Sequence, residues 1–238
     1  MGFKKQIIKT SFIFLIFFNL INAQSWEMEA FGTNGISGAN AYRELFKKLN
    51  YVDRSNIEGS PYNDSIYKTA TFYYKDNQKI AECLTRYNAY TDELEMMNTN
   101  GDIGVLQKVD FLRVSLNNKL YIALNSPNYK KGENRFFIEK VVHEKYSLYY
   151  RESKSLKEGV PAKSGYHTAT TSKFINNSEY YIKFNNGPLD EAPLTKSKLL
   201  KKFPNHQKTL KTYFLDNNIN LKKESDLINL VNYYNSLE

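Results

Sequence analysis

The chain has 238 residues, a formal net charge of +8 and one cysteine. That length suits one domain, and because Cys83 has no partner in the chain, the fold must depend on its apolar core rather than on disulfides. The 33 Lys and Arg and the 25 Asp and Glu residues are mixed along the sequence. We therefore expect no nucleic-acid partner, since nucleic-acid-binding proteins gather their basic residues on one face.

Residues 1–23 have the pattern of a secretory signal peptide. An apolar run covers residues 12–21 and is followed by Ala23, a small residue suited to a cleavage point. Three lysines precede the run: Lys4, Lys5 and Lys9. The run is too short to cross a bilayer as a helix, and no later segment approaches about twenty apolar residues. We expect cleavage after Ala23, export to the periplasm or the outside of the cell, and no transmembrane segment in the mature chain.

The mature chain, residues 24–238, begins with a short predicted helix over 42–49, where apolar residues recur at helical spacing. Strand-like runs then recur roughly every eight to twelve residues, with polar turns between them. They are predicted at 69–75, 79–87, 93–98, 109–116, 120–124, 136–142, 146–152 and 179–184. In 109–116 the even-numbered side chains, from Asp110 to Leu116, are expected to form the buried face. This order of elements predicts an antiparallel meander that closes as a β-sandwich or an open barrel.

Two later segments depart from the strand pattern. Residues 153–178 are rich in Ser, Thr, Lys and Gly and predict a long exposed loop. From about residue 195 the tail is predicted to be helical, with Thr195 as the first cap and three short apolar stripes that must pack on the sheet. We therefore expect the α+β class: one β-rich domain over 24–238 with a short N-terminal helix and a C-terminal helical tail.

Three segments resemble a known group of proteins. They are Gly59-Ser60-Pro61-Tyr62, the run from Arg86 to Glu95, and the run from Asp226 to Asn235. They resemble an uncharacterised family of small exported proteins of Bacteroidetes-type bacteria, and the similarity covers roughly residues 55–237. The resemblance implies an exported bacterial protein with a β-rich body and a helical tail. It implies no activity, cofactor or catalytic residue.

The histidines and the cysteine do not form a recognisable metal or nucleophile pattern. His143-Glu144 begins like a zinc-protease motif but lacks the second His four residues later, and its apolar neighbours predict a turn between strands. His167 and His206 lie in the predicted loop and at a predicted helix start. Cys83 could act as a nucleophile only beside a histidine, and we favour a packed residue within a strand. We predict no metal and no cofactor.

The segment 86–95 carries the most informative polar cluster. If the strand continues, period two places three of its side chains on one face: Arg86, Asn88 and Tyr90. Glu93 and Glu95 would share a face of the next strand, and with Asp92 they could supply the two carboxylates that glycoside hydrolysis requires. The interpretation that we favour is an arginine–carboxylate brace across a hairpin, which would hold the strand register.

These observations favour an exported, non-enzymatic protein of the bacterial envelope that binds or assembles with another macromolecule. Tyrosines could supply a contact surface, although ordinary packing is favoured; they are Tyr149, Tyr150, Tyr166, Tyr180 and Tyr181. Two alternatives stay open: a small-ligand carrier with a roomy barrel cavity, and a carbohydrate hydrolase that uses Asp92, Glu93 or Glu95 in a cleft. We predict no catalytic residue, and the sequence leaves the oligomeric state open.

Overall fold

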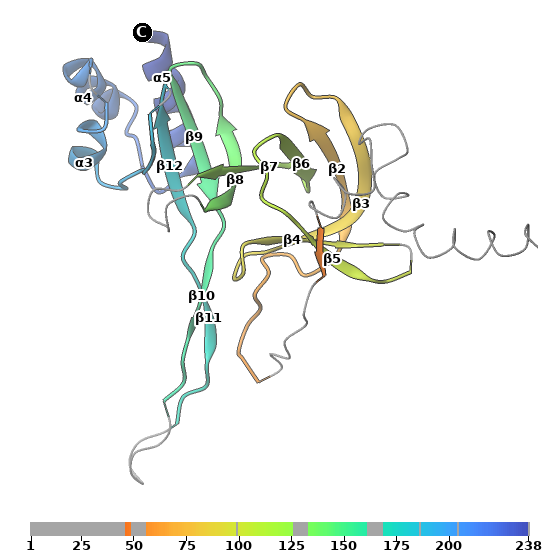
Figure 1. Ribbon diagram of the computed structural model, residues 1–238. Helices are drawn as coiled ribbons and strands as arrows, with labels where there is room; N and C mark the ends of the chain where they lie inside the picture. The colour runs from red at the N-terminus through yellow and green to blue at the C-terminus, as the bar shows by residue number, and fades with distance from the viewer. Residues whose placement is uncertain are drawn as a thin grey trace, which may run out of the picture.

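The computed structural model of the chain shows a large antiparallel sheet, a two-stranded ribbon and three C-terminal helices (Figure 1). The residues that it describes are 46–48, 56–98, 100–125, 133–160, 169–185, 187–203 and 205–237. The predicted signal peptide therefore lies outside the described residues. Within them, the expected α+β class of mostly antiparallel strands with C-terminal helices is confirmed.

The main sheet has eleven strands. Their bounds are β1 (Phe46–Lys48), β2 (Lys68–Tyr74), β3 (Lys79–Asn88), β4 (Glu93–Met97), β5 (Ile103–Leu106), β6 (Leu112–Leu116), β7 (Lys119–Asn125), β8 (Asn134–Val141), β9 (Tyr146–Arg151), β12 (Glu179–Phe184) and β13 (Leu189–Glu191). Their spatial order is β1-β5-β4-β3-β2-β6-β7-β8-β9-β12-β13. Two antiparallel meanders, β2–β5 and β6–β9, thus lie side by side through the pairing of β2 with β6. The sheet is open, with β1 and β13 at its two ends.

Local sequence explains why these strands and their turns form. In β6 every second side chain is buried, namely Leu112, Val114 and Leu116, as predicted. Asn117 and Asn118 follow with φ of 53° and 59°. Asn tolerates this left-handed region, and two such residues form the turn type that matches the twist of a hairpin. The chain therefore returns at once into β7. Asp110, predicted on the buried face, is instead exposed in the turn before β6.

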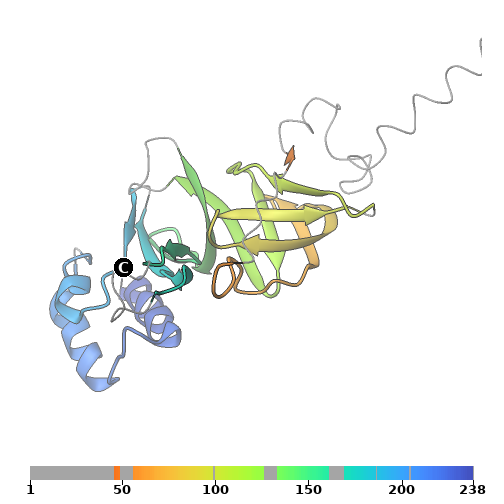
Figure 2. The same cartoon turned by 90° about the horizontal axis from the view of Figure 1, so that it is seen from below.

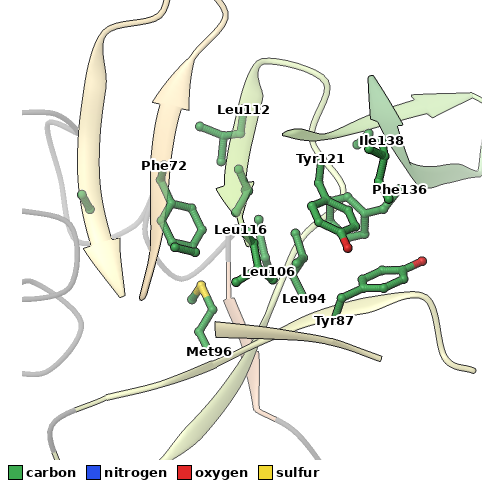
Figure 3. Packing of buried hydrophobic residues seen from close by; sticks show 14 of the residues in the cluster. Phe72, Tyr87, Leu94, Met96, Leu106, Leu112, Leu116, Tyr121, Phe136 and Ile138 are labelled. Atoms are coloured by element: carbon green, nitrogen blue, oxygen red, sulfur yellow. The ribbon is translucent and has the colours of Figure 1, made fainter. Parts of the chain in front are cut away.

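The first meander and its neighbours curl around a core that their side chains fill. Phe72 from β2, Leu94 from β4 and Leu112 from β6 are at most 4% exposed, and they point toward one another in Figure 3. Tyr121 and Phe136 extend the same cluster toward β7 and β8. Each such side chain contributes about 1.5–3 kcal/mol relative to an exposed position, so this core is a main source of stability.

The helix α5 (Glu224–Leu237) packs on β8 and β9, and α3 (Lys196–Leu200) and α4 (Gln207–Asp216) lie beside it and share its apolar cluster (Figures 1 and 2). The side chain of Tyr234 from α5 is fully buried, with its ring 4.5 Å from the rings of both Tyr146 and Phe203. Leu227 and Leu230 lie on the same buried face of α5. The prediction that the tail packs on the sheet is therefore confirmed. Among the described residues, no helix combines the length and the apolar character needed to cross a bilayer.

The predicted N-terminal helix over 42–49 is wrong where the structure describes it. Phe46–Lys48 is the strand β1, and Phe46 pairs with Leu106 of β5; the other residues of 42–49 lie outside the described part. A helix of about eight residues is marginal in water, whereas β5 offers this segment an edge to pair with. The strand β5 was not predicted, and β13 was not either.

The predicted loop over 153–178 is also wrong in part, since it contains β10 (Lys154–Lys157) and β11 (Lys173–Asn176). These strands pair antiparallel and form a ribbon that projects from the body in Figure 1. Near the outer end of β11, Glu58 N donates to Ser172 O at 2.9 Å and Phe174 N donates to Glu58 O at 3.1 Å, so Glu58 forms a parallel bridge with Lys173. The segment has too few large apolar residues for a core, which is why it resembled a loop. Residues 161–168 lie outside the described part.

Candidate functional site

The polar segment 86–95 forms the β3–β4 hairpin, and a buried ion pair lies at its centre. Arg86 and Glu95 are opposite each other in the register of the two strands. The Glu95 side chain is 1% exposed, and Arg86 Nε and Nη2 lie 2.8 and 2.7 Å from its Oε2. Asn88 Nδ2 donates to Oε1 at 2.8 Å. The favoured interpretation, an arginine–carboxylate brace across a hairpin, is confirmed.

Two tyrosines from the segment before β2 cover this ion pair. Tyr62 OH donates to Glu95 and lies 3.0 Å from both of its oxygens, while Tyr67 OH donates to Oε2 at 3.4 Å. The Arg86 guanidinium carbon is 4.0 Å from the centre of the Tyr62 ring and 4.4 Å from that of Tyr67, a cation–π geometry. The pKa of both tyrosines is raised, mainly because they are partly buried. The pKa of Tyr67 rises to about 12. Glu95 therefore has its hydrogen-bonding capacity used within the protein.

The covering segment is itself tied to the hairpin and to the ribbon. Ala89 N donates to Pro61 O at 3.0 Å. The Lys154 ammonium at the start of β10 donates to Ser60 O at 2.9 Å and to Tyr62 O at 2.6 Å, and burial lowers the pKa of Lys154. Two of the three motifs that carry the family resemblance thus lie against each other. Sequence reasoning did not connect them, because a turn motif gives no sign of its distant partner.

Asp92 belongs to a second buried cluster. It lies in the turn between β3 and β4 with φ of 58° and is 1% exposed. Its Oδ1 accepts from Tyr87 OH at 2.6 Å and from Phe136 N at 3.2 Å. Lys108 Nζ and Arg135 Nη1 lie 2.9 and 3.6 Å from its Oδ2. Asp92 thus holds the turn against β8 rather than facing solvent.

Glu152 is a third buried carboxylate, which sequence reasoning did not single out. Its Oε2 accepts from Tyr121 OH at 2.9 Å, and its Oε1 forms an ion pair with Lys119. Its backbone oxygen accepts from Tyr87 OH at 3.1 Å. A cavity of about 30 Å³ opens beside these side chains, which is room for about one water molecule. The partners come from strands far apart in sequence, so no local pattern could have revealed the cluster.

This geometry limits what the predicted acids can do chemically. A glycosidase pair must face the scissile bond from both sides, but the carboxylates of Asp92 and Glu95 are buried and engaged with side chains of the protein. Glu93 is half-buried on β4. Tyr90 does not share the strand face of Arg86, because β3 ends at Asn88 and the Tyr90 ring packs against Phe174, 5.2 Å away. The arrangement supports the fold and offers no pair of acids to a substrate.

His143, His206 and Cys83 lie where the sequence predicted. His143 is in the turn between β8 and β9, and His206 begins α4 with φ of 56°; His167 is outside the described residues. Cys83 is half-buried in β3, where its Sγ donates to Met97 O at 3.4 Å and burial raises the pKa of the thiol. In the part of the chain that is described, no three His, Cys, Asp or Glu side chains lie close enough to hold a metal ion.

The tyrosines suggested as a contact surface are mostly core residues. Tyr149 is 6% exposed and Tyr181 1%, so the surface prediction is wrong for both. Tyr150 and Tyr180 are partly buried and pack on each other, with ring centres 4.8 Å apart. Tyr166 lies outside the described residues. The favoured interpretation, ordinary packing, holds for the four that are described.

Comparison of the chain with protein-family models, with curated proteins and with solved structures gives no match. The resemblance to exported proteins of Bacteroidetes-type bacteria therefore stays a prediction. Function has to be inferred from the geometry of the molecule itself.

Proposed function

We propose that this chain is an exported, non-enzymatic protein of the bacterial envelope and that it binds another macromolecule through the ribbon of β10 and β11. The observation that carries the proposal is the projection of this ribbon from the body of the protein (Figure 1). Export is supported by the lysines and the apolar run within residues 1–23, and the family resemblance points the same way.

The ribbon has a fixed base and an exposed outer part. Lys154 anchors the base, because its backbone N donates to Ala89 O at 2.9 Å and its ammonium donates to two carbonyl groups of the segment that covers Glu95. Farther out, Lys157 and Lys173 are exposed and Val160 is 52% exposed. A ribbon that buries so little adds little to folding, since isolated two-stranded hairpins are marginal in water. Glu58 bridges β11 at Lys173, so what the ribbon offers a partner is its exposed side chains.

The alternatives have less support in the geometry. A carrier with a closed barrel would need a cavity of roughly 300–1,000 Å³ for its ligand, whereas the sheet is open and the core inside its curl is filled by side chains such as Phe72 and Leu94 (Figure 3). A hydrolase would need acids that face a substrate. Asp92 and Glu95 instead serve as acceptors within the protein.

The proposal is tested by shortening the ribbon in the mature chain. Replacement of residues 159–171 by Asn-Gly joins Glu158 to Ser172 through a two-residue hairpin turn and leaves β10 and β11 in place. Tagged wild-type and shortened proteins are cross-linked in the native envelope and isolated, with Val142→Ser as a control, because Val142 is 56% exposed in another turn.

We expect one stoichiometric envelope partner with the wild type and the control, and its loss with the shortened ribbon at unchanged thermal stability. Equal recovery of the partner with the shortened ribbon would contradict the assignment of the ribbon. In place of a protein, a co-purifying sugar would favour the hydrolase, and a lipid held in an internal cavity would favour the carrier.

A further inference from the structure

The positive charge of the chain is concentrated in one stretch near its C-terminus. Residues 192–223 contain eight lysines and one acid, Asp216, which is a net charge of +7 in a chain of net charge +8. The lysines are Lys196, Lys198, Lys201, Lys202, Lys208, Lys211, Lys222 and Lys223. The expectation that basic residues are mixed along the sequence is therefore wrong for this stretch, which contains α3, α4 and the connection that leads to α5.

The fold places these charges on the surface of one lobe. All of these lysines are exposed except Lys202, which is half-buried and pairs with Asp190 at 2.8 Å. Figures 1 and 2 show α3 and α4 at the end of the molecule opposite β2 and β3. We call α3, α4 and the connection to α5, residues 194–223, the lysine lobe. Its charge is remote from both the Glu95 cluster and the projecting ribbon.

Two features give the lysine lobe a defined binding surface. Lys208, Lys211 and Leu215 recur at spacings of three and four and so lie on one side of α4. A groove of about 450 Å³ lies between the start of α3 and the connection from α4 to α5. Its lining includes Lys196, Lys222, Lys223 and Leu194 and no acidic residue.

Two acids at the start of α5 are engaged within the protein. Glu224 pairs with Lys140 at 2.9 Å and accepts from Tyr180 OH at 3.0 Å. Asp226 accepts from the backbone N of Asn220, a residue that lines the groove, at 2.8 Å. Among the described residues, no carboxylate lies within the 4.0 Å ion-pair limit of the three groove lysines. Their positive charge is therefore available to an external anion.

We propose that the lysine lobe docks the protein on an anionic lipid bilayer, with the groove receiving lipid phosphate. The charge of the lobe argues for a partner surface with many negative charges. An anionic bilayer is such a surface, because its negative surface potential attracts every basic residue that lies close to it. Exposed leucines within the lobe argue for lipid rather than for a soluble polyanion. Leu215 is 77% exposed and Leu194 48% exposed, and apolar side chains among lysines insert at the boundary between headgroups and acyl chains.

This inference goes beyond the proposed function, because it concerns a different surface from the ribbon. It is tested with the full mature protein and vesicles of phosphatidylcholine with or without phosphatidylglycerol, by co-sedimentation over a series of salt concentrations. The test variants are the double substitution Lys208→Gln/Lys211→Gln and the single substitution Leu215→Ser. The matched control is Lys157→Gln/Lys173→Gln, which removes the same charge from the exposed ribbon.

We expect binding to phosphatidylglycerol vesicles only, with weaker binding at higher salt because ions screen the attraction. A basic residue near an anionic bilayer contributes about fivefold in affinity, so the lobe double variant should lose about 25-fold and the control much less. Leu215→Ser should weaken the vesicle binding that remains at high salt, because that part of the binding comes from the apolar side chain rather than from charge.

Other outcomes would overturn the proposal. One is equal binding to vesicles with and without phosphatidylglycerol. A second is an equal loss of vesicle affinity in the lobe double variant and in the control. A third is binding to dextran sulfate or inorganic phosphate that is as tight as binding to vesicles, together with no effect of Leu215→Ser on vesicle binding. The last result would assign the lobe to a soluble anion. Circular dichroism of each variant checks that the fold is intact, and every substituted side chain is exposed.

Discussion

Arg86 and Glu95 face each other across the β3–β4 hairpin, with Arg86 Nη2 2.7 Å from Glu95 Oε2 and the carboxylate 1% exposed. Tyr62 and Tyr67 cover the pair from a segment about thirty residues earlier in the chain. Loss of either charge would leave the other in a poorly hydrated site. The pair therefore fixes the register of the hairpin and the position of the covering segment at once.

Removal of the negative charge in Glu95→Gln should destabilise the protein strongly. Breaking a buried ion pair by removing one partner costs about 3–5 kcal/mol, because the remaining charge is uncompensated. Urea unfolding measures the change in free energy. The control is Glu82→Gln, which removes an exposed pair with Lys79 on the same strand and should leave the unfolding midpoint unchanged. Equal effects of the two substitutions would show that the Glu95 pair is not a stabilising element.

Asp92 allows charge and backbone conformation to be separated. Its φ of 58° lies in the left-handed region, which Asn tolerates but Ala does not. Asp92→Asn should cost about 3 kcal/mol through loss of the pair with Lys108. Asp92→Ala should cost about 1–2 kcal/mol more because it adds backbone strain. Urea unfolding of both variants tests this order, and an Ala variant as stable as the Asn variant would contradict the role of the turn conformation.

The tyrosines over Glu95 predict a loss of stability at alkaline pH. Burial raises the pKa of Tyr67 from 10.0 to about 12; Arg86 opposes this shift and Glu95 adds to it. The folded protein therefore keeps a proton that the unfolded chain loses, so its stability falls as the pH rises from about 10 to about 12. Tyr67→Phe should be less stable at neutral pH, since it loses a hydrogen bond, but should depend less on pH in this window. The test is to measure the free energy of unfolding of the wild type and of Tyr67→Phe between about pH 10 and about pH 12. If the free energy of unfolding falls as steeply with pH in Tyr67→Phe as in the wild type, Tyr67 is not the group responsible.

Sequence reasoning found the elements whose signal is local. Alternation in 109–116 predicted the buried side chains of β6, and the helical stripe with Leu227 and Leu230 predicted α5. The brace between Arg86 and Glu95 was also predictable, because the two residues lie on consecutive strands of one hairpin. In each case the information sits within about ten residues.

What sequence reasoning missed depends on contacts between distant segments. The apolar residues around Phe46 have helical spacing, but this segment pairs with the edge of β5 and forms a strand instead. The carboxylate of Glu152 accepts a hydrogen bond from Tyr121, which is 31 residues away, and its backbone oxygen accepts one from Tyr87, which is 65 residues away. The ribbon was read as a loop because its strands draw their support from Glu58 and the hairpin rather than from a core of their own. The count of lysines and acids in 192–223 could have revealed the lysine lobe from sequence alone.

Gly159 should be essential for the ribbon and dispensable for the body. A Cβ atom at this position would lie 2.2 Å from Thr170 O and 2.8 Å from Ser172 N, both backbone atoms that cannot move without opening the ribbon. Gly159→Ala should therefore increase amide hydrogen exchange in β10 and β11 and leave exchange in the sheet unchanged. Lys157→Ala, an exposed change on the same ribbon, is the control. Exchange in the ribbon equal to that of the control would contradict the close approach.

Site-specific photo-cross-linking tests most directly that the ribbon binds a partner. A photoreactive residue replaces Val160 on the ribbon in one protein and Val142 in the β8–β9 turn in another; these side chains are 52% and 56% exposed. We predict that position 160 cross-links to one macromolecule in the native envelope and that position 142 does not. Cross-linking of that molecule from position 142 alone, or none from position 160, would contradict the account.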